Sequence, residues 1–219
     1  MQGILGSFGA LQYGGVVIYP LLCLALVGVA IMLDKAYVYL RFVRLPRNLV
    51  DAVETRDFDW DKVDAELRAL GSRNLIAGFF RTISTNRAKP AWWIEAQAGD
   101  EAYFVQTALN RGLWVLETIV TGAPLLGLLG TITGMMNAFK IIGNHGMVDP
   151  SGVTAGVAQA LIATALGLLI AIVALFGFNF FTRQHAKTMD EMERLGTRLI
   201  NHVRLDQETL GGRIPHEVA

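Results

Sequence analysis

Three long apolar runs, separated by charged stretches, dominate the pattern of side chains along this chain. The first run covers residues 14–34, and two longer runs cover residues 112–142 and 153–182. A helix of about twenty apolar residues is long enough to cross the hydrocarbon core of a lipid bilayer. The pattern therefore predicts an all-α integral membrane protein with three long transmembrane helices.

The polar stretches outside these runs predict further helices. Residues 35–111 alternate acidic and basic side chains with apolar positions at helical spacing, and residues 183–219 show an amphipathic pattern. We expect a helical domain from the first stretch and a helical tail from the second. Residues 1–13 carry no charge and predict a short interfacial segment, and residues 143–152 predict a turn-rich connector.

The distribution of basic residues predicts the orientation in the membrane. The connector contains neither Lys nor Arg, and Lys140 is the nearest basic residue before it. Basic residues gather instead at the opposite ends of the spans: Arg41, Arg44, Arg47, Arg111, Arg183 and Lys187. Because basic flanks stay in the cytoplasm, we expect the N-terminus and the connector outside, in the periplasm. The domain of residues 35–111 and the C-terminal tail are then cytoplasmic.

Composition excludes several classes of function. Hydrophobic residues make up 53% of the 219 residues and charged residues only 17%, with a net charge of zero, so nothing indicates a nucleic-acid partner. The single cysteine, Cys23, lies in an apolar run, and no Cys/His spacing is typical of a metal site. We expect no metal, no cofactor and no enzymatic activity. The histidines are expected to be solvated: His145, His185, His202 and His216.

Small residues punctuate the second and third apolar runs. Membrane helices associate through close backbone packing, because lipid supplies little hydrophobic driving force between them. Three spans are also too few to seal a pore, so we expect a ring of identical subunits. The small residues predicted to pack helices together are Gly127, Gly130, Gly134, Ala163, Gly167 and Ala171.

Polar residues inside these runs are the candidates for an ion path. Glu117 is ionisable and lies near the cytoplasmic end of the second span; the alternative is a snorkelling residue, or one paired with Arg111. On an ideal helix Glu117, Thr121, Pro124, Leu128 and Thr131 share one face, which favours Thr131 as a pore-lining residue. Thr164 on the third span is a similar candidate. Its alternative is a hydrogen bond to a carbonyl of its own helix.

The run APLLGLLGTITGMMNAF, residues 123–139, followed by the apolar residues 156–172, resembles the membrane hairpin of the MotA/TolQ/ExbB proton-channel family. The resemblance is closest to the ExbB/TolQ branch. It implies that Thr131 and Thr164 line the inner pore. Many members carry a glutamate five residues before the latter threonine, where this chain has Gln159. An amide cannot ionise, so this departure argues against direct protonation of the subunit at that point of the ion path.

The resemblance also implies an assembly and a location. Members form homopentamers of three-span subunits around the single helices of an ExbD- or TolR-like partner. An aspartate of that partner takes up the proton, and its motion passes to a TonB- or TolA-like protein. The leading hypothesis is thus an ExbB-like subunit of a motor in the bacterial inner membrane, driven by the proton-motive force, that energises TonB-dependent outer-membrane transport.

Two alternatives remain at this stage. The same fold could act as a TolQ-like subunit in envelope maintenance or gliding. A hypothesis from a different class is a structural membrane scaffold without an ion path, which predicts that valine is harmless at Thr131 and Thr164.

Overall fold

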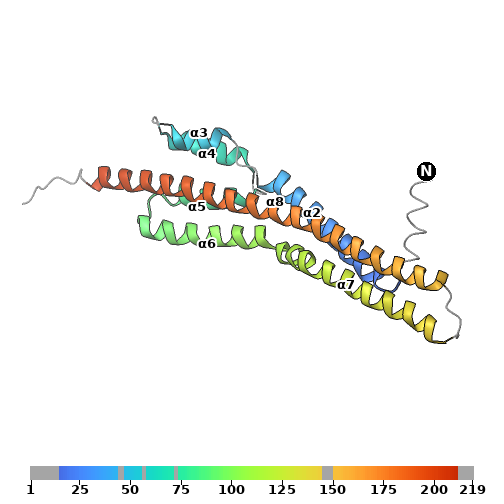
Figure 1. Ribbon diagram of the computed structural model, residues 1–219. Helices are drawn as coiled ribbons and strands as arrows, with labels where there is room; N and C mark the ends of the chain where they lie inside the picture. The colour runs from blue at the N-terminus through green and yellow to red at the C-terminus, as the bar shows by residue number, and fades with distance from the viewer. Residues whose placement is uncertain (1–14, 44–46, 56–57, 72–73, 145–149, 212–219) are drawn as a thin grey trace, which may run out of the picture. The chain divides into compact units, whose positions relative to one another are not determined.

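All regular elements in the described part of the chain are helices. The structure, a computed structural model, describes residues 15–43, 47–55, 58–71, 74–144 and 150–211 (Figure 1). The helices are α2 (Ile18–Phe42), α3 (Arg47–Glu54), α4 (Trp60–Ala69), α5 (Leu75–Thr85), α6 (Ala91–Asn110), α7 (Leu113–Asn144) and α8 (Pro150–Gly211). The prediction of an all-α chain is confirmed for these residues. The predicted interfacial segment of residues 1–13, most of the connector and the last residues of the tail lie outside them.

Three of the helical stretches are long and apolar enough to cross a membrane, as the sequence predicts. They are Ile18–Arg41, Ala91–Lys140 and Ser151–Thr209. The chain divides into two compact units. The first contains the chain up to Asp34 together with Gly112–Phe181, and the second contains Lys35–Arg111 and the chain from Thr182 onward.

Helix α2 differs in extent from the predicted first span, whereas α8 continues beyond the third span as the amphipathic tail predicts. Helix α2 begins at Ile18 and ends at Phe42, so Pro20 lies in its first turn, where its missing N–H group interrupts no helical hydrogen bond. Helix α8 continues for 62 residues, without a break where the apolar run gives way to the amphipathic tail. The side chains change from apolar to amphipathic, so the first part of the helix suits lipid and the second part suits water. The backbone continues as a helix, because no proline follows Pro150 within α8 to end it.

Within the first unit, α7 and the N-terminal half of α8 lie side by side with their backbones in contact (Figure 1). A methyl group added to Gly134 would lie 3.0 Å from the Gly156 carbonyl oxygen. One added to Gly167 would lie 2.6 Å from the Ala123 carbonyl oxygen and 3.0 Å from the Gly127 Cα atom. Glycine is therefore needed at these positions by close approach of backbone to backbone.

The six small residues predicted to pack helices are all buried in this unit: Gly127, Gly130, Gly134, Ala163, Gly167 and Ala171. The contacts described above join two helices of one chain. They consequently supply no argument for the ring of identical subunits that the sequence led us to expect. Leu21 of α2, together with Val17 just before it, packs in a buried cluster with Ile119, Ala123 and Ala171.

The second unit has a conventional apolar core. Phe80 and Ile83 of α5, Ile94 of α6 and Leu195 of α8 are fully buried in it. A methyl group added to Gly196 would lie 2.5 Å from the Cζ atom of the Phe79 ring, so α8 approaches α5 closely at this point.

A buried ammonium group lies at the C-terminal end of α6. Lys35 is only 3% exposed, and its Nζ donates to the Leu109 carbonyl at 2.8 Å and to the Ala108 carbonyl at 3.5 Å. A cation is favourable there because the last carbonyls of a helix lack intrahelical partners and carry the negative end of its dipole.

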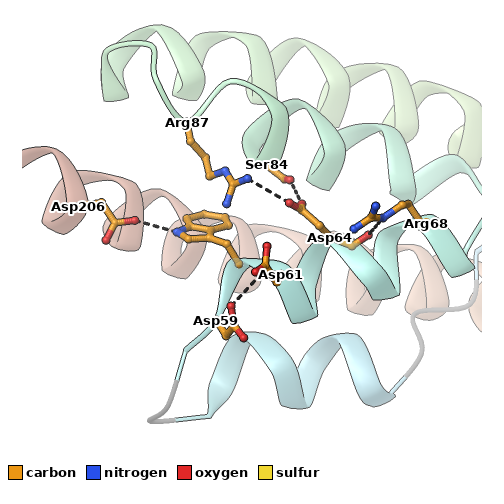
Figure 2. Close-up of polar contacts among 8 residues, drawn as sticks. Asp59, Asp61, Asp64, Arg68, Ser84, Arg87 and Asp206 are labelled. Atoms are coloured by element: carbon orange, nitrogen blue, oxygen red, sulfur yellow. Dashed lines mark hydrogen bonds and ion pairs between the residues drawn. The ribbon is translucent and has the colours of Figure 1, made fainter.

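Side chains in the C-terminal part of α8 form hydrogen bonds with the start of α4 and with the α5–α6 loop. The Trp60 Nε1 donates to Asp206 at 2.8 Å (Figure 2). The Gln207 Nε2 donates to the carbonyls of Arg87 at 3.1 Å and Lys89 at 2.7 Å. These bonds fix a loop that has little secondary structure of its own.

The expectation that the histidines are solvated is wrong for both that the structure describes. The His202 ring stacks on Phe58, with centroids 3.7 Å apart. Burial lowers the pKa of His202, Asp206 opposes that shift and Arg198 adds to it. His185 is half-buried, and in the described part of the chain no hydrogen-bond partner reaches its Nε2. His145 and His216 lie outside the described residues.

The close approach of α7 and α8 gives a first prediction. Gly167→Ala places a methyl group against backbone atoms that cannot rotate away, so we expect it to destabilise the protein by about 1–3 kcal/mol. The measurement is thermal unfolding of the purified protein in detergent. Gly122→Ala on α7 is the control, because apart from its chain neighbours and the adjacent backbone of its own helix no described atom lies within 4 Å of the added methyl group. Equal destabilisation by both substitutions would contradict the packing described.

Candidate functional site

The predicted polar face of α7 is partly exposed in the isolated chain. Glu117, Thr121 and Leu128 are exposed, and Pro124 and Thr131 are half-buried. In the part that the structure describes, no ion pair includes Glu117. This face is thus available to another helix or to water, and its one carboxylate lies near the start of α7.

The hydroxyl group of Thr131 is bonded within its own helix. Its Oγ1 donates to the Leu128 carbonyl at 2.6 Å. Thr133, two residues on, donates in the same way to the carbonyls of Leu129 and Gly130, both at 3.1 Å. The hydroxyl hydrogen of Thr131 is therefore already used, and its oxygen keeps a lone pair with which it can accept a hydrogen bond.

Thr164 makes the cross-helix bond of the hairpin. Its Oγ1 donates to the Gly127 carbonyl of α7 at 3.0 Å. The alternative drawn from the sequence, a bond to a carbonyl of its own helix, is wrong. A methyl group on Gly127 would lie 3.1 Å from the Thr164 Cα atom, so the missing side chain is what lets the two backbones come near enough for this bond.

Gln159 lies against the start of the first membrane helix. Gly15 has a φ of 67°, in the left-handed region that favours glycine. A side chain at that position would collide with the Gln159 amide. Gln159 and Thr164 are five residues apart in α8, which places them about 140° apart around the helix. Their side chains therefore leave α8 in different directions.

The four predicted ion-path residues do not form one bonded cluster. Among the described residues, no hydrogen bond joins any two of Glu117, Thr131, Gln159 and Thr164. The middle of the hairpin is also without ionisable acids or bases, since residues 118–139 and 151–182 contain no Asp, Glu, His, Lys or Arg. Within the described residues there is also no group of three or more Cys, His, Asp or Glu that could hold a metal ion.

Sequence reasoning missed a polar network in the second unit. Asp64 accepts hydrogen bonds from Ser84 and, at 3.1 Å, from Arg87, whose guanidinium lies 4.7 Å from the centre of the Trp60 ring (Figure 2). The spacing of Asp64 and Arg68 suggests an ion pair along α4. Instead, the Arg68 Nε donates to the Asp64 carbonyl, and the carboxylate is paired across helices. The sequence gives no signal for these long-range partners.

Comparison with known proteins identifies the hairpin. Residues 71–194, more than half of the chain, match the MotA/TolQ/ExbB proton channel family. This chain belongs to that family. The match covers α5, α6, α7 and the part of α8 up to residue 194, and so includes the close-packed hairpin with Thr131 and Thr164.

Individual members of the MotA/TolQ/ExbB family are moderately similar to this chain. The biopolymer transport protein ExbB-like 1 of Synechocystis is 30% identical over 196 residues, which cover 85% of this chain and 74% of the relative. ExbB-like 3 of the same organism is 31% identical over 77% of this chain and 81% of its own length. The biopolymer transport protein ExbB of Aquifex aeolicus is 36% identical over 42% of this chain and 62% of its own length.

The different bonds of the two threonines give the second prediction. Thr164→Val keeps the shape but removes the bond to Gly127, so we expect a loss of about 0.6 kcal/mol, and up to about 1.7 kcal/mol, in thermal unfolding. Thr164→Ser should restore most of it. Thr131→Val removes only a bond within one helix and is the matched control, with little expected change. If Thr131→Val were as destabilising as Thr164→Val, the cross-helix bond would not have the role assigned to it.

Proposed function

We propose that this chain is the channel-housing subunit of a motor that is driven by the proton-motive force in a bacterial inner membrane. Family membership, three helices of spanning length and relatives named biopolymer transport protein ExbB support this role. The role is ExbB-like: the subunit energises TonB-dependent transport together with a single-span partner of the ExbD type, and the partner passes its motion to a TonB-like protein.

The observation that carries the proposal is the absence of ionisable acids and bases from the middle of the hairpin. A proton that crosses a dry pore needs a group that alternates between charged and neutral forms. Glu117 is too near one end of the span to be the central site. The titrating acid is therefore supplied by a helix of the partner, and this subunit encloses it.

Thr131 and Thr164 then act as hydrogen-bond acceptors. Both hydroxyl hydrogens are used inside the subunit, for the Leu128 and Gly127 carbonyls. The remaining lone pairs can accept a hydrogen bond from a protonated carboxyl group of the partner. Gln159 supplies a neutral amide and Glu117 a carboxylate near the cytoplasmic mouth, where it assists proton exit.

Several copies of the subunit are required to enclose such a helix. The described residues of one chain offer three spans, and large apolar side chains such as Leu125, Leu168 and Phe176 are exposed on them. A homopentamer is the arrangement that the family implies. The N-terminus and the connector face the periplasm, and residues 35–111 and the tail face the cytoplasm, in line with the basic flanks.

The orientation gives the third prediction. In a Cys23→Ala background, a cysteine at the exposed Ser151 should react with an impermeant maleimide in intact spheroplasts. A cysteine at the exposed Ala88 should react only after the membrane is permeabilised. The opposite labelling pattern would overturn the orientation.

The source of the titrating group gives the fourth prediction. Proteoliposomes that contain this chain alone should not conduct protons under an imposed membrane potential, as measured with a pH-sensitive dye inside the vesicles. Vesicles that also contain the single-span, aspartate-bearing partner should conduct. We expect Thr131→Val to reduce this flux to the level of partner-free vesicles, and Glu117→Gln to reduce it only in part.

Thr118→Val is the matched control for Thr131→Val. Thr118 is exposed on α7 and also bonds a carbonyl of its own helix, that of Trp114 at 2.8 Å. It lies about 140° around the helix from Thr131. Flux should survive this substitution. Conduction by the chain alone, lost in Glu117→Gln, would show that the titrating acid belongs to this subunit, and a complex without flux would favour a structural scaffold.

A further inference from the structure

A cavity of about 430 Å³ opens on the second unit, between α4, α5 and the loop that follows α5. Its lining combines three arginines with one carboxylate and two hydroxyl groups: Arg68, Arg81, Arg87, Asp64, Ser84 and Thr85, together with Leu67. It has no part in the hairpin or in the proposed ion path.

Both oxygens of the Asp64 carboxylate in this cavity already have partners. One oxygen of Asp64 accepts the Ser84 hydroxyl, and the other accepts the Arg87 guanidinium at 3.1 Å (Figure 2). Arg87 is held a second time by the Trp60 ring, 4.7 Å from its Cζ atom. The charges of Asp64 and Arg87 therefore neutralise each other, and this ion pair is a fixed part of the cavity lining.

The positive charges of two other arginines in the lining, Arg68 and Arg81, remain uncompensated. Arg68 uses only its Nε, for a carbonyl of its own helix at 3.1 Å. Arg81 uses one Nη for the Leu67 carbonyl, at the long distance of 3.5 Å. Neither arginine forms an ion pair with any carboxylate of the described residues. Both keep several N–H donors on planar forks that suit an oxyanion.

We propose that this cavity binds a dianion of the phosphate class, either inorganic phosphate or a phosphate monoester. Two arginines on different helices and the Thr85 hydroxyl offer donors from several directions. A single arginine fork satisfies a planar carboxylate, whereas the tetrahedral phosphate group has three or more oxygens that take donors from several sides. Two uncompensated charges also match a dianion, and the volume leaves room for the organic part of an ester.

Binding is measured by ³¹P NMR titration of inorganic phosphate with the purified full chain in detergent, at constant ionic strength. We expect saturable line broadening and a matching rise in the unfolding temperature that chloride does not produce. Arg81→Gln and Arg68→Gln should each weaken binding by about tenfold or more. Both side chains are exposed, and both variants should unfold at the parent's temperature without phosphate.

Lys62→Gln is the matched control. Lys62 is exposed on α4 outside the cavity, and its loss changes the net charge by the same amount. Its phosphate affinity should equal that of the parent. Equal weakening by Lys62→Gln, or no difference between phosphate and chloride, would show general screening and overturn the site.

Two further probes define the ligand. Glycerol 3-phosphate should bind at least as tightly as inorganic phosphate if the cavity takes an ester, and more weakly if it takes the free ion. Hexaglutamate tests an acidic protein segment instead. If it bound more tightly than either phosphate compound and lost affinity in Arg68→Gln and Arg81→Gln, the cavity would be a peptide-docking site, and the proposal would fail.

Discussion

The first unit depends on direct contact between the backbones of α7 and α8. Lipid provides little hydrophobic force between helices, so the pair needs close packing and hydrogen bonds between helices. Glycine supplies the approach at Gly127, Gly134, Gly156 and Gly167, where the nearest backbone atom would lie 2.6–3.0 Å from an added methyl group. The same approach brings the Gly127 carbonyl within reach of the Thr164 hydroxyl. The close packing and the hydrogen bond from Thr164 to Gly127 are thus consequences of a single constraint, the absence of side chains where α7 and α8 meet.

Much of this architecture could be predicted from the sequence, because its causes are local. The length of the apolar runs predicts the three spans, and the small residues of the second and third runs identify the surfaces along which α7 and α8 pack. Their partners could not be predicted: the spacing of Gly130 and Gly167 fits a contact between subunits as well as the contact within one chain that the structure has. The amphipathic pattern beyond residue 182 predicts that the third helix continues past the membrane span, and α8 does continue as a helix to Gly211.

For the candidate site, too, the residues could be predicted from the sequence but their hydrogen-bond partners could not. Thr131, Thr164 and Gln159 were chosen by residue type and position, which sequence provides. Their bonds depend on tertiary neighbours: Thr164 reaches Gly127, Gln159 lies against Gly15, and Thr131 bonds its own helix. In the second unit, the spacing along the sequence suggests a different ion pair from the one in the structure. Asp64 and Arg68 have the spacing of an intrahelical ion pair, yet the carboxylate pairs with Arg87 and leaves the charge of Arg68 uncompensated.

The bonds of the two threonines bear on the direction of proton movement in the proposed motor. A hydroxyl whose hydrogen is already donated can only accept, and so it stabilises a protonated, neutral carboxyl group more than a carboxylate. The surrounding apolar residues act in the same sense, because burial disfavours the charged form. An acid of the partner beside Thr131 and Thr164 is therefore held neutral within the hairpin, and it ionises where water or a cation is near. In the proposed motor, the Glu117 carboxylate near the cytoplasmic end of the span is the group that accepts the proton which the partner's acid releases.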